Sequence, residues 1–254
     1  MNDRSLLRQW GHAFKRTSFV RFVRGFFFDG STVRKAEPML WQFICDNVGS
    51  GWRCVDVGAS RGEFSFLMAR KTGVSGFVYA FELHPENARL LQSNLWRYRY
   101  RVKVENLAVT DGKTELAEVF PGRSRSGAEW NIVGHDTTGQ NMQPEFSVKA
   151  TSLDDYFPPG ERIDLVKIDV EGAAREVLAG MRRILRESRP LIIIEVHNNS
   201  EWEGRKRLED AEYTLFDLGG RKLADAGNFA FHCVAAPKGR QVKSFSPKTS
   251  AKTS

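Results

Sequence analysis

The spacing of apolar residues changes along the chain from the period of a strand to that of a helix and back. An apolar run at 53–57 precedes apolar residues at helical spacing over 64–71, and the same change recurs at 76–82 and about 85–96. A helix at 37–47 comes before these elements, and a strand at about 102–109 and a polar stretch at 111–147 follow them. The order then resumes with a strand ending near Asp169, a helix at about 173–186 and the apolar run 191–196. Alternating strands and helices predict an α/β domain.

The later strands indicate how the sheet is built. They lack the alternation of a half-exposed sheet, which favours parallel strands covered by helices on both faces. Near the end, the segments 213–223 and 229–236 are joined by a turn with Gly and Asp and no intervening helix, so they should pair antiparallel. The predicted fold class is a doubly wound α/β domain with a mostly parallel sheet and an antiparallel C-terminal strand pair.

The net charge of +7 is concentrated at the two ends of the 254-residue chain. Residues 1–35 hold eight Lys/Arg and two acidic residues, and residues 238–254 hold five Lys/Arg and no acidic residue. The remaining 25 basic and 29 acidic residues give the predicted catalytic domain, 36–237, a slight negative charge. A nucleic-acid partner is therefore not expected, although the charge keeps a nucleic-acid methyltransferase as an alternative. The tail 238–254 is rich in Ser, Thr and Lys, which predicts disorder.

The N-terminal segment 1–35 interleaves aromatic and basic residues, as in "FVRFVRGFFF". This pattern suits a peripheral contact with an anionic membrane, but a helix packing its aromatic face on the domain is an open alternative. No apolar run approaches the roughly 20 residues that span a bilayer. The three cysteines have neither CxxC spacing nor a histidine at zinc-like separation, so we expect no disulfide or zinc knuckle and a cytoplasmic location.

The stretch "CVDVGASRGEFSFLMA" joins a strand to a helix through a glycine turn, where backbone N–H groups can face a polar ligand. The turn lacks the middle glycine of GxGxxG, and Asp56 would repel a pyrophosphate. A carboxylate there suits the ammonium of S-adenosylmethionine, and Glu82 at the next strand end suits its ribose hydroxyls. The predicted cofactor residues at these strand ends are Asp56, Gly58, Ala59, Ser60, Gly62, Glu82 and Ala108. A tight turn beside two incidental surface acids is the alternative.

Several motifs extend this interpretation to a family. "CVDVGASRGEFS", "YAFELHPENARLLQSNL", "KIDVEG" and "RPLIIIEVH" occur in the order and spacing of the FkbM-type S-adenosylmethionine-dependent methyltransferases, which the chain resembles from about Trp52 to His197. The last two motifs together are the most specific. The resemblance implies a Rossmann-like class I methyltransferase fold and O-methylation of a hydroxyl on a sugar, glycolipid or natural product. Ser60 and Ala174 depart from common choices, a glycine and an acidic residue, but the proposed cofactor carboxylates are both present.

Methyl transfer to an alcohol requires an aligned oxygen and removal of its proton. Strand ends place Asp169, Glu171 and His197 near the expected methyl position, so these three are the predicted catalytic residues. Alternatively, the two acids shape the turn and cap the next helix, and His197 is structural. The spacing does not establish a cation bridging Asp169, Glu171 or Glu195 to the acceptor, and no metal site is predicted.

Acceptor choice is assigned to the polar insert 111–147, which contains groups able to stack on or hydrogen-bond a sugar: Arg123, Arg125, Trp130, Asn131 and His135. Disorder of this insert is the alternative. The expected partner is a small-molecule or glycan acceptor. Against a nucleic-acid methyltransferase, the chain has no Asn/Asp-Pro-Pro-aromatic tetrapeptide and no Pro-Cys nucleophile. A non-catalytic membrane- or partner-binding protein on the same fold is the other alternative, and the presence of both Asp56 and Glu82 argues against it.

Overall fold

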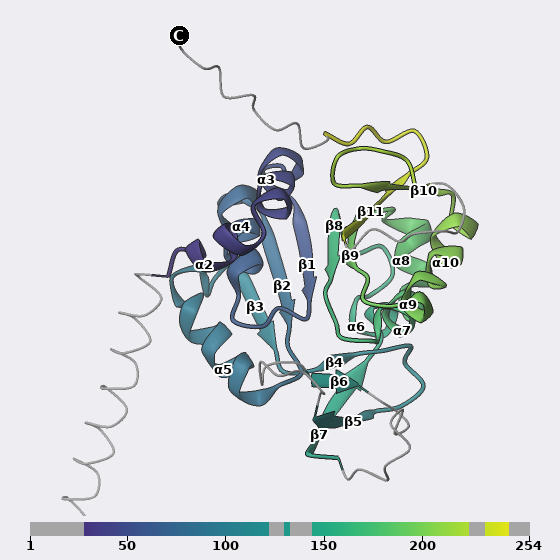
Figure 1. Cartoon of the computed structure of the whole chain (residues 1–254). Coiled ribbons are helices and arrows are strands. Elements are labelled where there is room, and N and C mark those ends of the chain that lie inside the picture. Colours follow the sequence, from purple (N-terminus) through teal and green to yellow (C-terminus); the bar gives the residue numbers. More distant parts are fainter. Residues whose placement is uncertain (1–27, 122–129, 133–143, 224–231, 244–254) are drawn as a thin grey trace, which may run out of the picture.

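A seven-stranded sheet forms the centre of the computed structural model, which describes residues 28–121, 130–132, 144–223 and 232–243 (Figure 1). The strand order is β10-β11-β9-β8-β1-β2-β3. The strands are β1 (Arg53–Val57), β2 (Phe77–Phe81), β3 (Val102–Glu105), β8 (Leu165–Ile168), β9 (Leu191–Glu195), β10 (Tyr213–Asp217) and β11 (His232–Pro237). Neighbours from β9 to β3 are parallel, whereas β11 runs antiparallel to both β9 and β10. The predicted mostly parallel sheet with an antiparallel end is confirmed.

Helices cover both faces of this sheet (Figure 1). One side carries α2 (Ser31–Ala36), α3 (Pro38–Asn47), α4 (Glu63–Thr72) and α5 (Pro85–Asn94), followed by the short helix η1 (Trp96–Tyr98). The other side carries α6 (Leu153–Tyr156), α7 (Ala174–Ala179), α8 (Arg182–Glu187), α9 (Asn199–Trp202) and α10 (Arg205–Asp210). Within β1, Val55 and Val57 pack toward α7 and α8, whereas Cys54 packs toward α3 and α4. Burial on both faces explains the continuous apolar runs of the central strands.

The helix predicted at about 173–186 is interrupted, so the prediction of one continuous helix was wrong. It divides into α7 and α8 at Gly180. The chain passes so close to another segment here that a Cβ on Gly180 would lie 2.1 Å from the carbonyl oxygen of Thr110. Close backbone contact therefore selects glycine and ends α7, which the apolar spacing could not reveal.

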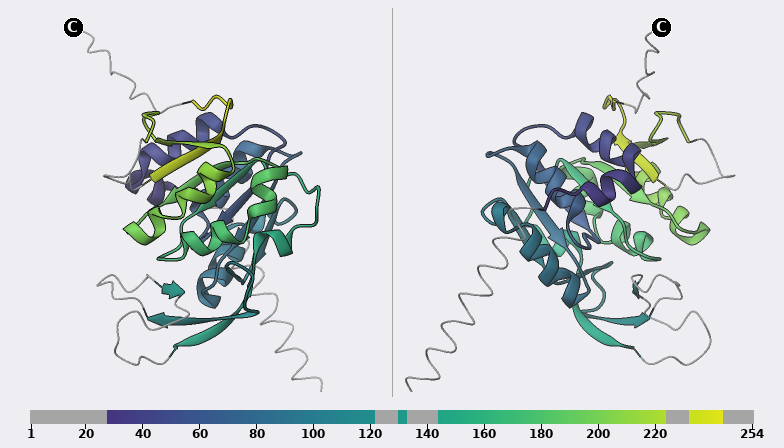
Figure 2. Two further views of the ribbon diagram at one scale, coloured as in Figure 1. Left: turned by 90° about the vertical axis from the view of Figure 1, so that its right-hand side faces the viewer. Right: turned by 60° about the vertical axis from the view of Figure 1, so that its left-hand side comes forward.

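The strand predicted at 102–109 also divides, and its second part joins a separate small sheet. Asn106 lies at the break, where its side-chain amide donates to the carbonyl oxygens of Glu82 and Leu83. The small sheet has the order β4-β7-β5-β6 and comprises β4 (Ala108–Val109), β5 (Leu116–Pro121), β6 (Trp130–Ile132) and β7 (Phe146–Thr151). It extends from one end of the main body (Figure 2). The polar insert is thus partly β-structure.

Several predictions fall outside the described residues. These include most of the N-terminal segment and of the tail, and the insert residues Arg123, Arg125 and His135. Where the description begins, the Phe28 ring lies with its centroid 5.6 Å from that of Phe66 on α4. In the described ranges, no helix has both the length and the apolar character needed to cross a membrane.

Candidate functional site

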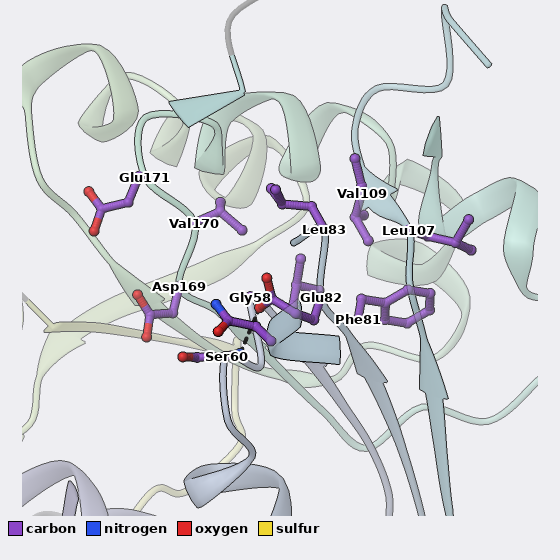
Figure 3. A pocket seen from close by; sticks show the side chains of 13 residues that line it. Gly58, Ser60, Phe81, Glu82, Leu83, Leu107, Val109, Asp169, Val170 and Glu171 are labelled. Carbon is purple, nitrogen blue, oxygen red and sulfur yellow. Dashed lines mark hydrogen bonds between the residues drawn. The ribbon is translucent and has the colours of Figure 1, made fainter. Parts of the chain in front are cut away.

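A cavity of about 220 Å³ opens at the carboxyl ends of β1, β2 and β8 (Figure 3). The chain proceeds from β1 toward β3 on one side and from β8 toward β9 on the other, so the cavity lies at the switch point of the sheet. Its lining residues are Val57, Gly58, Ser60, Phe81, Glu82, Leu83, Asn87, Leu107, Ala108, Val109, Asp169, Val170 and Glu171. Of the predicted site residues, six line it, whereas Asp56, Ala59, Gly62 and His197 do not.

The cavity has two chemically different sides. In Figure 3, Asp169 and Glu171 lie on one side, Phe81, Leu107 and Val109 lie on the other, and Glu82 lies between them. Leu107 and Val109 come from the segment that leads into and forms β4, so the small sheet begins at the cavity wall. An apolar wall beside an acidic one can hold a ligand that combines a flat ring with hydrogen-bond donors.

The glycine turn is fixed by close packing. Gly58 has φ 77°, and a Cβ there would lie 1.8 Å from the carbonyl oxygen of Asp169. Only glycine therefore allows the end of β1 to approach the end of β8 so closely. Ser60 has φ 49°, a left-handed conformation that glycine favours, which agrees with the glycine found at this position in many methyltransferases.

The N–H groups of the turn are directed into the protein. The amides of Gly58 and Ala59 donate to the Phe81 carbonyl oxygen at 3.0 and 2.9 Å, and the Gly62 amide donates to the Ala59 carbonyl oxygen at 2.9 Å. The Ser60 amide donates to Glu82 Oε2 at 2.7 Å. The turn therefore does not offer these four groups to an anion, and Ala59 and Gly62 shape the site from behind. This arrangement agrees with the absence of the dinucleotide motif.

Glu82 is the best-placed hydrogen-bond acceptor in the cavity. Its side chain is held by two amides, with Oε2 accepting from Ser60 and Oε1 accepting from the His84 amide at 2.8 Å. Burial raises the pKa of Glu82, although the two amide hydrogen bonds oppose this shift. Each carboxylate oxygen can accept a second hydrogen bond. The residues present therefore fit an adenosine group, with Glu82 for the ribose hydroxyls and the apolar wall for the base.

Asp56 lies beneath the turn, not on the cavity wall. The residue is only 1% exposed, and its Oδ2 accepts a hydrogen bond from the Ser65 hydroxyl at 2.6 Å. Its Oδ1 lies 3.8 Å from the Lys167 Nζ. The structure thus gives Asp56 a positive partner from the protein itself, because β1 pairs with β8 and places Asp56 opposite Lys167. The Asp56 side chain is therefore not positioned for the direct contact with a methionine ammonium that the sequence predicted.

Lys167 connects Asp56 to the acidic side of the cavity. Its buried Nζ lies 2.7 Å from Asp169 Oδ2. Burial alone would raise the pKa of Asp169, but the Lys167 ammonium brings it below its ordinary value, so Asp169 is ionised at neutral pH. The sequence interpretation missed Lys167. Its signal was a single lysine inside the apolar run "LVKIDV", which is unusual because a buried charge requires a partner.

The three predicted catalytic residues belong to one cluster. His197 Nδ1 lies 3.8 Å from Glu171 Oε2, and His197 Nε2 lies 3.8 Å from Glu195 Oε1. Asp169 and Glu195 are close enough for their carboxylates to interact. Glu171 and Asp169 face the cavity, whereas His197 is in contact with Glu171 from outside the lining set. The cluster can accept and redistribute a proton.

Glu195 extends this cluster toward two residues that the sequence interpretation missed. Its Oε2 lies 3.6 Å from His232 Nε2, which lies 3.0 Å from Glu37 Oε2. Burial disfavours the charged imidazole, but Glu195 and Glu37 outweigh it and raise the pKa of His232 to about 9. The register that pairs β11 with β9 sets His232 opposite Glu195. The sequence predicted that the two C-terminal strands pair antiparallel, but it did not give the register that places His232 opposite Glu195.

Comparisons with known proteins identify a family and a fold. The chain matches the family described as Methyltransferase FkbM domain over residues 56–222. The crystal structure of Methyltransferase FkbM from Methylobacillus flagellatus KT is similar with a TM-score of 0.50 and 20% identity, covering 74% of this chain and 44% of that one. This likeness shows a shared fold.

Two curated relatives match shorter regions. The AMB antimetabolite synthetase AmbE of Pseudomonas aeruginosa is 25% identical over 179 residues, covering 58% of this chain. The protein-L-isoaspartate O-methyltransferase of Methanothrix thermoacetophila is 31% identical over 94 residues, covering 36% of this chain. The chain spans only 8% and 43% of the lengths of these relatives.

Proposed function

Because this chain belongs to the FkbM methyltransferase family and has the class I methyltransferase fold, we propose that it transfers a methyl group from S-adenosylmethionine to a hydroxyl oxygen. The enzyme class and the cofactor follow from the family. The observation that supports a site for this reaction is the cavity at the switch point, in which Glu82 stands between an apolar wall and an acidic wall. The acceptor we propose is a sugar, a glycolipid or another hydroxylated natural product.

Residues on the Glu82 side of the cavity would hold the cofactor. Glu82 would accept hydrogen bonds from the ribose hydroxyls, since Ser60 and His84 fix its orientation and a carboxylate oxygen can accept more than one hydrogen bond. Phe81, Leu107 and Val109 would contact the adenine ring. Asp56 would not contact the cofactor directly. It would act through Lys167, by keeping the end of β8 in position.

Residues on the acidic side would prepare the acceptor. Bound S-adenosylmethionine supplies a methyl carbon on a sulfonium, which is open to in-line attack by an oxygen nucleophile. Asp169 would accept a hydrogen bond from the acceptor hydroxyl and orient it, because Lys167 keeps Asp169 ionised and fixed. Glu171, also on the wall, would take up the proton and share it with His197.

The small sheet would select the acceptor. Its first strand, β4, contributes Ala108 and Val109 to the cavity wall, and its other strands lie within the insert 111–147 or next to it. Long connections that extend from a rigid domain often carry specificity. We therefore assign acceptor choice to this sheet and to the loops that join its strands.

A methyl-transfer screen tests the proposal. The full chain is incubated with methyl-labelled S-adenosylmethionine and fractions of a cell extract, and labelled products are identified by mass spectrometry. We expect label on a hydroxyl oxygen of a small molecule or glycan. Label in RNA or DNA would support the alternative of a nucleic-acid methyltransferase. Cofactor binding without label in any fraction would favour a non-catalytic protein on the same fold.

A further inference from the structure

Three side chains at the carboxyl ends of β8 and β9 are of the types that bind divalent metals. Asp169, Glu195 and His197 each offer one donor atom, and the three atoms lie within 4.8 Å of one another. Ligands about 2.1 Å from an octahedral ion are separated by roughly 3–4 Å. The three side chains therefore need only small rotations to share one ion. Sequence spacing gave no such set, because the fold brings Glu195 and His197 to Asp169 from a neighbouring strand.

The imidazole of His197 is oriented as in a metal site. Its Nε2 faces Glu195 Oε1 at 3.8 Å, and its Nδ1 faces Glu171 Oε2 at 3.8 Å. A histidine that binds a metal through one ring nitrogen usually donates the N–H of the other to a carboxylate. Glu171 occupies the position of that carboxylate. It would fix the tautomer of His197 that leaves Nε2 available to a cation.

The charge around these residues favours a cation. The ion pairs of this region join five carboxyl groups, Asp56, Asp169, Glu171, Glu195 and Glu37, to the ammonium of Lys167 and the imidazoles of His197 and His232. With the five carboxyl groups ionised, negative formal charge remains in excess even when both imidazoles are protonated. Lys167 contacts Oδ2 of Asp169 at 2.7 Å, which leaves Oδ1 as the donor for a metal.

We propose that Asp169, Glu195 and His197 bind a divalent transition-metal ion such as Mn²⁺ beside the cofactor cavity. The imidazole nitrogen in the set favours Mn²⁺ or Zn²⁺ over Mg²⁺ or Ca²⁺, which prefer oxygen ligands only. Because Asp169 lines the cavity, an open coordination position would face the space for the acceptor.

The role of the ion rests on the proposed function. A hydroxyl bound to the metal has a lowered pKa. Its proton would pass to Glu171, and its oxygen would form a bond to the methyl carbon while the carbon–sulfur bond breaks and the sulfur keeps the electron pair. The metal would thus complement the acidic residues instead of replacing them.

A second set of possible ligands overlaps the first. Glu37, Glu195 and His232 also place one donor atom each within 4.8 Å of one another. However, His232 Nε2 lies at hydrogen-bond distance, 3.0 Å, from Glu37 Oε2, and none of the three residues lines the cavity. We therefore assign the ion to the set that contains His197, and the two sets are separable by mutation.

Mn²⁺ binding to the chelator-treated full chain tests the assignment. Electron paramagnetic resonance should show one Mn²⁺ per chain, and Glu195→Gln and His197→Gln should each weaken its affinity about tenfold or more. Glu37→Gln and the exposed Glu203→Gln are matched carboxylate controls that should retain the parental affinity. Absence of Mn²⁺ binding in the parent would overturn the proposal, as would loss in Glu37→Gln with retention in His197→Gln.

Two measurements on the parent protein avoid dependence on the folding of variants. Pulsed resonance of the Mn²⁺ complex should show coupling to one imidazole nitrogen, and a signal without nitrogen coupling would contradict ligation by His197. In the methyl-transfer assay, chelator-treated enzyme should lose activity and regain it with Mn²⁺. Full activity without metal would overturn this proposal and leave O-methylation standing. Failure to bind S-adenosylmethionine would instead contradict the proposed function, whatever the outcome for Mn²⁺.

Discussion

Asp169 combines two interactions that a single substitution can separate. Its carboxylate faces the cavity and also neutralises the buried ammonium of Lys167. Asp169→Asn keeps the shape of the side chain but removes the charge. We expect turnover to fall by about 10²–10⁴-fold, because the acceptor hydroxyl loses its orienting anion. Cofactor affinity should barely change, since Glu82 lies on the other side of the cavity. The two effects are read from initial rates and from calorimetric titration.

A stability measurement shows which role of Asp169 dominates. Asp169→Asn removes the nearer of the two carboxylates that pair with the buried Lys167 ammonium and leaves Asp56 at 3.8 Å. Because a buried charge is costly without a close partner, the free energy of unfolding should also decrease. Glu171, which lines the same cavity and is paired with His197, offers Glu171→Gln as the matched variant. If Asp169→Asn is less stable yet methylates at the parental rate, Asp169 is structural and the acceptor is activated elsewhere.

At the residue scale, the sequence predicted the positions at strand ends but not their partners. Glu82 and Asp169 could be found because parallel strands end at the same edge of a sheet. The inward direction of Asp56 could not, since it depends on Lys167 in β8 being opposite it. Pairing between strands far apart in sequence decides which carboxylate faces a ligand and which faces a buried lysine.

At the scale of elements, β11 connects the site to the N-terminal side of the domain. It lies between β9 and β10, and its first residue, His232, contacts Glu195 on β9 and Glu37 just before α3. Both contacts pair the imidazole of His232 with a carboxylate. The stability that His232 adds should depend on pH.

The sign follows from the pKa of His232, which lies at about 9 in the folded chain against an ordinary value of 6.5. The contribution is therefore complete below about pH 6.5 and is lost as the pH rises through about 9. The free energy of urea unfolding should differ between the parent and His232→Gln by about 1–3 kcal/mol below about pH 6.5. Above about pH 9.5 the difference should be much smaller. An equal difference at both values would show that His232 is not charged in the folded state.

The elements themselves were predictable to different degrees. The strands and helices around the cavity followed from apolar periods and the glycine turn. The small sheet was missed because its strands are short and lie in or beside a polar stretch. Only a few of their residues are buried together: Ala108, Ala117, Val119 and Val148. Such short strands are defined by pairing between distant segments, and composition alone does not reveal which segments pair.

At the scale of the whole molecule, the basic N-terminal segment remains a candidate membrane contact. Residues 1–27 carry six Lys/Arg against one acidic residue, and Phe28 already packs on Phe66. Deletion of residues 1–27 should therefore lower binding to anionic vesicles, because each basic residue near such a surface adds about 1 kcal/mol to the binding free energy. Vesicle sedimentation at low and high salt measures this effect. The free energy of unfolding should not change. A truncated chain that loses stability would favour packing of the segment on the domain, and one that binds vesicles as before would contradict the membrane contact.

Glu82 is proposed to anchor S-adenosylmethionine at the switch point of the sheet. The most direct measurement is calorimetric titration of the full chain with the demethylated product, S-adenosylhomocysteine, using Glu86→Gln on the exposed start of α5 as the control. The parent and the control should bind it with equal affinity, NAD should not bind, and Glu82→Gln should weaken binding by about 1–3 kcal/mol, the value of a hydrogen bond to a charged group. Parental affinity in the folded Glu82→Gln variant, or no binding by the parent, would show that the cofactor does not bind through Glu82.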